Sequence, residues 1–198
     1  MWQPSLADLR LEKSMNKVLL FNPRSAVAKH RIPNSIMNIA ASVNGVYDWM
    51  IVDGNRETDP YKRIKSYLAT GEYKYIGFTI MPGPQTKQGI PFAKKIKEEF
   101  PGTIMIWGGY FPTSHYKVVL NSGYVDFVIN GPGDYAFPQL IDALENNKPY
   151  ELIKNLIYKS DGEILRNAKL DLIEQDSLPA LPYDKLNIIY PVEKYLGK

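Results

Sequence analysis

The stretch IWGGYFPT (Ile106–Thr113) is followed by a second one of similar design, VDFVINGPGD (Val125–Asp134). Each begins as a short apolar run, typical of a buried strand, and ends abruptly in glycine. A strand that ends in glycine lets bare backbone approach a ligand, because no Cβ stands in the way. In an open parallel sheet, ligands bind at the carboxyl ends of the strands. The two stretches therefore predict one rim of a ligand site, although glycine after a strand can also serve the turn alone.

Strands and helices alternate along the chain on both sides of these stretches. Apolar runs ended by Asn, Gly or Pro predict buried strands at 17–21, 48–53, 75–81, 103–107 and 126–129. Helix-start signals or helical spacing of apolar residues predict helices at 34–43, 59–70, 86–100, 113–121 and 135–146. This alternation is typical of a doubly wound, Rossmann- or flavodoxin-like α/β fold, so we expect a five-stranded parallel sheet.

The pattern changes beyond Pro149. Two short apolar runs, 156–159 and 163–166, flank Asp161 and Gly162, which predicts a β-hairpin with Asp-Gly at its turn. The run LPALP at 178–182 predicts a stiff, extended connector. We therefore divide the chain into a polar lead-in (1–15), an α/β domain (16–148) and a β-hairpin with a proline-containing linker (149–198), and we expect a further domain after it.

Composition excludes several classes of function. The 198 residues carry a net charge of +3 without a dense Lys/Arg run, and no apolar run approaches the length of a membrane span. We therefore expect a cytoplasmic chain without a nucleic-acid or membrane partner. Cysteine is absent and histidine occurs only twice, which excludes thiolate metal sites and a cysteine nucleophile in this chain. The chemistry that the chain serves is expected to reside in a bound molecule or in another domain.

The order of the strand-end motifs resembles that of a known family. The matching pieces are VLLFNP (18–23), IVD (51–53), IGFTI (76–80), GGYFPT (108–113) and the stretch 125–134. Together they resemble the cobalamin-binding domain that precedes the catalytic barrel in cobalamin-dependent radical S-adenosylmethionine enzymes, over roughly residues 16–190. Pro132 and Asp134 depart from the family pattern Gly-Glu-Gly-Glu.

The resemblance implies a cobalamin that binds at the carboxyl edge of the sheet and contacts the residues that follow the strands. It also implies an iron–sulfur cluster and S-adenosylmethionine in a downstream radical domain, with methyl transfer as the expected reaction and this chain not catalytic alone. The candidate cofactor-binding residues are Asn22, Pro23, Arg24, His30, Asp53, Thr79, Ile80, Met81, Gly83, Thr86, Gly108, Gly109, Tyr110, Phe111, Pro112, Thr113, Asn130, Gly131, Pro132 and Gly133.

Two of these residues have competing interpretations. His30 lies in the loop where other cobalamin domains carry the lower cobalt ligand in Asp-x-His-x-x-Gly, but Ala28 and Pro33 replace the flanking Asp and Gly. These departures favour a loop histidine over a cobalt ligand, and both interpretations stay open. Thr79 can donate a hydrogen bond to a buried heteroatom, or it can be a β-branched residue suited to strand packing. For the tail of the cofactor we expect a place beside Gly108 and Gly109.

Other cofactor classes fit the sequence less well. A flavodoxin-like domain that binds flavin mononucleotide needs a phosphate loop after its first strand, and Asn22–Val27 is a poor version of one. A nicotinamide cofactor needs Gly-x-Gly-x-x-Gly at the same place, whereas the only Gly-x-Gly of the chain follows the fifth expected strand. Flavin mononucleotide binding and a ligand-free protein-interaction domain remain the alternatives to cobalamin.

Overall fold

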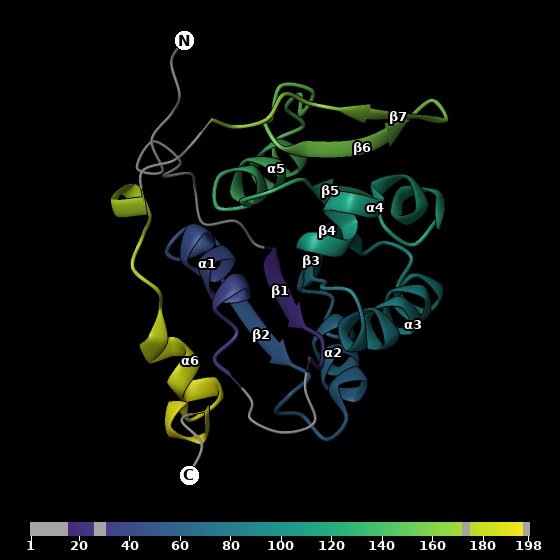
Figure 1. Ribbon diagram of the computed structural model, residues 1–198. Helices are drawn as coiled ribbons and strands as arrows, with labels where there is room; N and C mark the ends of the chain where they lie inside the picture. Colours follow the sequence, from purple (N-terminus) through teal and green to yellow (C-terminus); the bar gives the residue numbers. More distant parts are fainter. Residues whose placement is uncertain (1–15, 26–30, 172–174, 196–198) are drawn as a thin grey trace.

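The computed structural model describes residues 16–25, 31–171 and 175–195, and it contains a sheet of seven strands in the order β2-β1-β3-β4-β5-β6-β7 (Figure 1). The first five strands are parallel, with β1 paired between β2 and β3. The strands are β1 (Lys17–Asn22), β2 (Trp49–Asp53), β3 (Tyr73–Thr79), β4 (Ile104–Gly108), β5 (Phe127–Ile129), β6 (Leu156–Ser160) and β7 (Glu163–Arg166).

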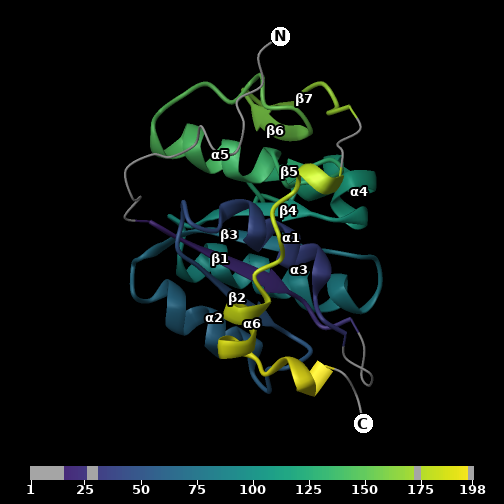
Figure 2. The same ribbon diagram turned by 90° about the vertical axis from the view of Figure 1, so that its left-hand side faces the viewer.

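Helices cover both faces of the sheet, as the alternating pattern predicts. One face packs against α1 and α5, and the other packs against α2, α3 and α4 (Figures 1 and 2). The helices are α1 (Asn34–Val43), α2 (Pro60–Leu68), α3 (Pro84–Glu99), α4 (Tyr110–Asn121), α5 (Ala136–Glu145) and α6 (Tyr183–Ile189). The mostly parallel, doubly wound α/β architecture is therefore confirmed.

Successive residues of each parallel strand enter opposite cores. In β1, Val18 and Leu20 pack under α1 and α5, whereas Leu19 and Phe21 pack under α2 and α3, and all four side chains are fully buried. Alternation of this kind follows from the two-residue period of a strand. Burial on both faces explains why the strands read as continuous apolar runs.

The five expected parallel strands are present, but the sheet has seven strands because the expected hairpin joins it instead of standing apart. β6 pairs antiparallel with β5, with Phe127 opposite Tyr158 and Ile129 opposite Leu156. β5 would otherwise end the sheet as an unpaired edge, and β6 covers that edge while burying Leu156, Ile157 and Tyr158. The turn itself is as predicted, since Asp161 and Gly162 both have positive φ.

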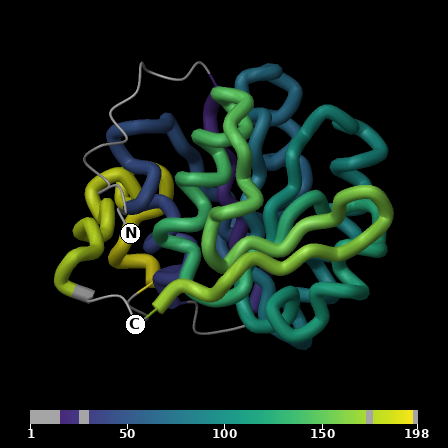
Figure 3. Tube along the Cα trace, turned by 90° about the horizontal axis from the view of Figure 1, so that it is seen from above, coloured from purple at the N-terminus to yellow at the C-terminus, as the bar shows by residue number. Residues whose placement is uncertain are grey.

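The linker also contains more structure than an extended connector. After the run at 178–182 the chain forms α6 and a short 3-10 helix, Val192–Tyr195, which lie beside α1 (Figure 3). Leu186 is fully buried there, and Tyr190 and Tyr195 are 9% and 6% exposed. The physical reason is that these three apolar groups close the core under α1, which the proline spacing of the linker does not reveal.

Within the described residues, none of the helices combines the length and the apolar character that crossing a membrane requires.

Candidate functional site

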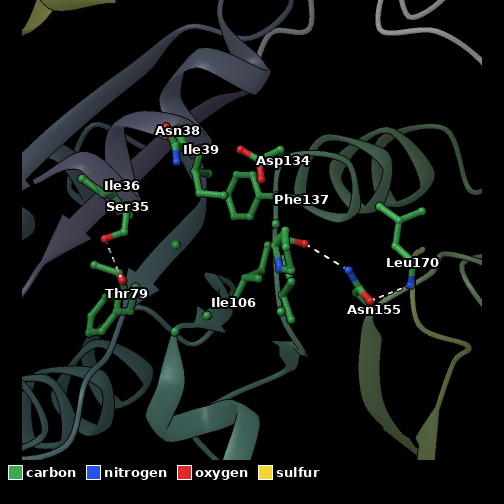
Figure 4. Close-up of a pocket in the computed structure, with 18 of the residues that line it drawn as sticks. Ser35, Ile36, Asn38, Ile39, Thr79, Ile106, Asp134, Phe137, Asn155 and Leu170 are labelled. Carbon is green, nitrogen blue, oxygen red and sulfur yellow. Dashed lines mark hydrogen bonds between the residues drawn. The ribbon is translucent and has the colours of Figure 1, made fainter. Parts of the chain in front are cut away.

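A cavity of about 560 Å³ lies between α1 and the carboxyl ends of β3, β4 and β5 (Figure 4). Its volume falls in the range of small-molecule pockets. Six of the residues predicted from the sequence line it: Thr79, Gly108, Gly109, Gly131, Pro132 and Gly133. The cavity therefore brings together three strand ends that the sequence analysis singled out.

The hollow exists because small residues replace large ones at the end of two strands. Tyr75 and Ile106 fill the core below, on the face that α1 and α5 cover. Further along the same face stand Gly77 and Thr79 of β3 and Gly108 of β4, with Thr79 and Gly108 paired in register. A Cβ on Gly108 would meet no atom within 4 Å, so Gly108 leaves open space toward the cavity.

Gly109 has a different role from its neighbour. Its φ is +98°, and a Cβ there would lie 2.8 Å from the backbone oxygen of Ile80. That oxygen accepts a hydrogen bond from the amide of Phe111, so Gly109 allows the end of β3 to close against the start of α4. Both glycines line the cavity, but only Gly108 has open space around its Cβ position, whereas Gly109 makes a tight backbone contact.

Few polar groups reach the cavity. Ser35 Oγ of α1 and Thr79 Oγ1 of β3 share a hydrogen bond of 3.3 Å at its wall, drawn as a dashed line in Figure 4. Asn155, which has a positive φ of 66°, donates from Nδ2 to the oxygen of Pro132 and accepts at Oδ1 from the amide of Leu170. Asn155 thus ties the loop after β5 to the segment after β7. Asp134, 8% exposed, also lines the wall.

Other predicted site residues lie outside this lining. They are Asn22, Pro23, Arg24, Asp53, Ile80, Met81, Gly83, Thr86, Tyr110, Phe111, Pro112, Thr113 and Asn130. α4 begins at Tyr110, so the four residues from Tyr110 to Thr113 form its first turn instead of the expected loop. The structure ties Thr113 to β5, because its Oγ1 donates to the oxygen of Ile129 at 3.4 Å. His30 lies outside the described residues.

The polar residues at the ends of β1 and β2 form hydrogen bonds with one another. Asp53, fully buried, accepts at Oδ1 from the side-chain amide of Asn22 (2.9 Å) and from Asn55. Its Oδ2 accepts from the hydroxyl of Tyr195 at 2.9 Å. Gln85 completes the cluster by donating to Asn22 Oδ1 at 3.1 Å. We call Asn22, Asp53, Asn55 and Gln85 the polar cluster.

The tyrosines of the C-terminal segment close this cluster. Tyr190 accepts from the amide of Asp53 and donates to Glu57 at 2.7 Å. Burial, followed by the neighbouring carboxylates, raises the pKa of Tyr190 and of Tyr195 well above the ordinary value. Both phenols are therefore neutral donors over the physiological range, and they hold the segment against the end of β2.

Sequence reasoning missed the wall opposite the strand ends. It includes Ser35, Asn38 and Ile39 of α1, Phe137 of α5, and Asn155 and Leu170 near the hairpin. The sequence predicted α1 and α5 as helices but did not indicate which of their residues face the carboxyl edge of the sheet. Among the described residues there is no group of three or more His, Cys, Asp or Glu side chains that could hold a metal ion.

Comparison with known proteins gives no match to any family model, but it finds related sequences. The chain is 29% identical over 80 residues (40% of the chain) to the anaerobic magnesium-protoporphyrin IX monomethyl ester cyclase of Synechocystis. It is 25% identical over 187 residues (90% of the chain) to an uncharacterized methyltransferase of Pyrococcus horikoshii. The matched segments amount to 16% and 40% of the lengths of these two relatives.

Two solved enzymes share the fold. The chain superposes on the cobalamin-dependent radical S-adenosylmethionine enzyme OxsB, bound to aqua-cobalamin and S-adenosylmethionine, with a TM-score of 0.79 at 17% identity. That match covers 96% of this chain and 26% of OxsB. The radical S-adenosylmethionine methyltransferase TsrM of Kitasatospora setae, bound to cobalamin and a [4Fe-4S] cluster, gives a TM-score of 0.63 at 14% identity, over 84% of this chain and 31% of TsrM.

The resemblance indicated by the order of the sequence motifs is thus confirmed at the level of the fold: nearly the whole chain has the fold of one part of the cobalamin-dependent radical S-adenosylmethionine enzymes.

Proposed function

We propose that this chain binds cobalamin at the carboxyl edge of its sheet and presents it to a radical S-adenosylmethionine domain that catalyses methyl transfer. The observation that carries the proposal is the cavity beside Gly108, in a chain whose fold neighbours are cobalamin-dependent enzymes. Cobalamin supplies the cobalt chemistry. The residues of this chain bind and orient it, and the iron–sulfur cluster and S-adenosylmethionine belong to the proposed partner domain.

The cavity suits the nucleotide tail of cobalamin. Ile36, Ile39 and Phe137 offer an apolar surface to a flat aromatic base, and the open side of Gly108 leaves the width that such a base needs. Thr79 stands at the inner end, where its hydroxyl can donate to a heteroatom of the base while Ser35 holds it in place. The residues present therefore fit the group.

The corrin ring would lie over the strand ends outside the cavity. Met81, at the end of β3, and Tyr110, at the start of α4, are 50% and 63% exposed at that edge. Exposed large apolar side chains next to a cavity are the surface that a broad, flat ligand would cover. We retain Met81, Gly83 and Tyr110 as proposed ring contacts, and we propose that His30 does not ligate the cobalt.

The test is titration of the 198-residue chain with hydroxocobalamin, followed by gel filtration and visible spectroscopy. We expect one equivalent of red pigment to co-elute with the protein. Complete separation of the pigment would overturn the proposal. A yellow, flavin-containing protein would support the flavodoxin-like alternative instead, and a colourless protein that binds neither would support an interaction domain.

A matched pair of glycine substitutions locates the site. Gly108→Leu places a branched side chain in the cavity, and we expect its affinity for hydroxocobalamin to fall by roughly 100-fold or more because the tail loses its space. Gly102→Leu is the control, since a Cβ there also meets no atom within 4 Å but Gly102 lies in an exposed turn after α3. Equal affinities of the two variants would show that the cavity is not the tail site.

A further inference from the structure

Asp134 differs from the other buried aspartates because it has no hydrogen-bond or ion-pair partner among the described residues. Three aspartates of the described part of the chain are buried: Asp53, Asp134 and Asp142. Asp53 accepts hydrogen bonds from three residues, and Asp142 is paired with Lys148 at 2.9 Å and with Asn146 at 2.8 Å. No described residue donates a hydrogen bond to the Asp134 carboxylate or forms an ion pair with it, although the residue is only 8% exposed.

The backbone that precedes Asp134 packs against α1 and α5. The preceding Gly133 is packed so closely that a Cβ would lie 2.8 Å from Ile39 of α1, and its oxygen accepts from the amide of Phe137. Figure 4 shows the carboxylate at the wall of the cavity, directed toward Asn38 and Ile39 and next to the ring of Phe137. It therefore faces the space that a ligand would occupy.

The carboxylate oxygens of Asp134 are not fully buried, and the side chain lines the cavity. In the free protein only solvent in the cavity can solvate this charge, and a ligand that fills the cavity displaces that solvent. Groups of this kind in native structures call for an explanation, and at a cavity wall the natural one is a donor that arrives with the ligand. The lining holds no lysine or arginine that could instead neutralise it.

We propose that Asp134 accepts a hydrogen bond from a neutral donor of the bound ligand, a hydroxyl or an amide N–H, and so selects for a ligand that carries such a donor beside an apolar body. This inference rests on the proposed function. In cobalamin such donors are the sugar hydroxyls of the nucleotide tail and the amides of the corrin rim. The carboxylate would repel the phosphodiester, so the negatively charged linkage lies away from Asp134.

The first test compares Asp134→Asn with Asp142→Asn, the same change at an aspartate of equal exposure whose partners lie within the protein. Without ligand, we expect Asp134→Asn to leave the melting temperature within about 2 °C of the wild type, because no described residue donates to the carboxylate and its oxygens reach solvent. Asp142→Asn should lower it, because the substitution weakens the bonds to Lys148 and Asn146. A fall for Asp134→Asn as large as that for Asp142→Asn would show that Asp134 serves the fold and would overturn the inference.

The second test measures the affinity of the same variants for hydroxocobalamin and for cobinamide, which has the corrin amides but lacks the nucleotide tail. Asp134→Asn should weaken hydroxocobalamin binding roughly 10-fold, while Asp134→Glu, which keeps the carboxylate, and Asp142→Asn should stay within about threefold. A loss confined to hydroxocobalamin assigns the donor to the tail hydroxyls, and an equal loss for cobinamide assigns it to the amides.

The two failures are distinguishable. Equal affinity of Asp134→Asn and the wild type for both corrinoids overturns this inference and leaves the proposed function standing. If the wild-type chain binds neither corrinoid, the proposed function fails, and the assignment of a corrinoid donor fails with it.

Discussion

The two halves of the carboxyl edge of the sheet differ in how their polar groups are satisfied. At the ends of β1 and β2, the polar cluster around Asp53 is hydrogen-bonded internally and closed by Tyr190 and Tyr195. At the ends of β3, β4 and β5 the edge is hollow, lined by glycines, and one carboxylate, Asp134, has no donor among the described residues. The chain itself satisfies the polar groups of the first half, and we propose that a ligand satisfies Asp134 in the second half.

The difference teaches which kind of buried polar residue points to a ligand. Asp53 is the last residue of β2 and Asp134 lies in the loop after β5, and they are 0% and 8% exposed, so residue type and low residue exposure do not separate them. Their partners do. The carboxylate of Asp53, which accepts from three residues, stabilises the fold, whereas we propose that the carboxylate of Asp134, to which no described residue donates, gains its donor from a ligand.

The largest effect should come from removing the centre of the polar cluster. Asp53→Ala leaves Asn22, Asn55 and Tyr195 with buried donors that have lost their acceptor. We expect the free energy of unfolding in urea to fall by about 3 kcal/mol or more. Affinity for hydroxocobalamin at a temperature where the variant is folded should stay within about twofold. A large loss of affinity with normal stability would place Asp53 in the ligand site and break the comparison.

A smaller effect on stability is expected from substitutions at the two adjacent glycines at the end of β4 that line the cavity, Gly108 and Gly109. Gly109→Ala puts a Cβ 2.8 Å from the oxygen of Ile80 at a φ of +98°, which should cost about 2 kcal/mol of stability. Gly108→Ala, with open space around its Cβ, should change stability by less than about 0.5 kcal/mol. Thermal unfolding of the two variants side by side decides the matter, and equal losses would contradict the division of roles between the adjacent glycines.

A still smaller effect is expected from Asn155, which connects the loop after β5 to the segment after β7 at the cavity wall. Asn155→Gly keeps the positive φ accessible and removes only the side-chain hydrogen bonds to Pro132 and Leu170. We expect roughly 1 kcal/mol lower stability and about 5-fold weaker hydroxocobalamin binding, because the outer wall loses its tie to the loop after β5. As a control, Asn121→Gly removes an exposed side-chain contact with Lys159 and should leave affinity unchanged. Binding that is unaffected in Asn155→Gly would exclude the hairpin segment from the site.

The smallest effect concerns the pH dependence of stability at the polar cluster, where Tyr195 donates to Asp53. Tyr195 has a raised pKa because of burial and the neighbouring Asp53 charge, so its neutral form is favoured in the folded protein. In the unfolded chain the phenol ionises near pH 10. The stabilisation that the neutral Tyr195 phenol gives to the folded protein is therefore complete below pH 10 and is lost as the pH rises further. Tyr195→Phe should lower the free energy of unfolding by about 1 kcal/mol at pH 8, measured in urea, and the difference between variant and wild type should narrow above pH 10. A difference in unfolding free energy that widens above pH 10 would contradict this expectation.

Local structure was largely predictable because it depends on neighbouring residues. Asp59 caps α2, its carboxylate accepting from the amide of Lys62, and Pro60 occupies the first position, as the sequence indicates. The hairpin turn at Asp161 and Gly162 and the glycine ends of β4 and β5 follow from the same kind of local chemistry. The start of α4 was less predictable, because the aromatic pair Tyr110 and Phe111 reads as loop until Gly109 is known to adopt a positive φ.

The sequence by itself determined the alternation of strands and helices, the parallel core and the strand ends where the cavity lies, because period and turn chemistry are written in adjacent residues. Only the tertiary structure decided that β6 covers β5, that Tyr190 and Tyr195 close over Asp53, and that no described residue donates to Asp134. These outcomes depend on which distant side chains meet, and that is set by strand register and by the docking of helices, neither of which a linear pattern encodes.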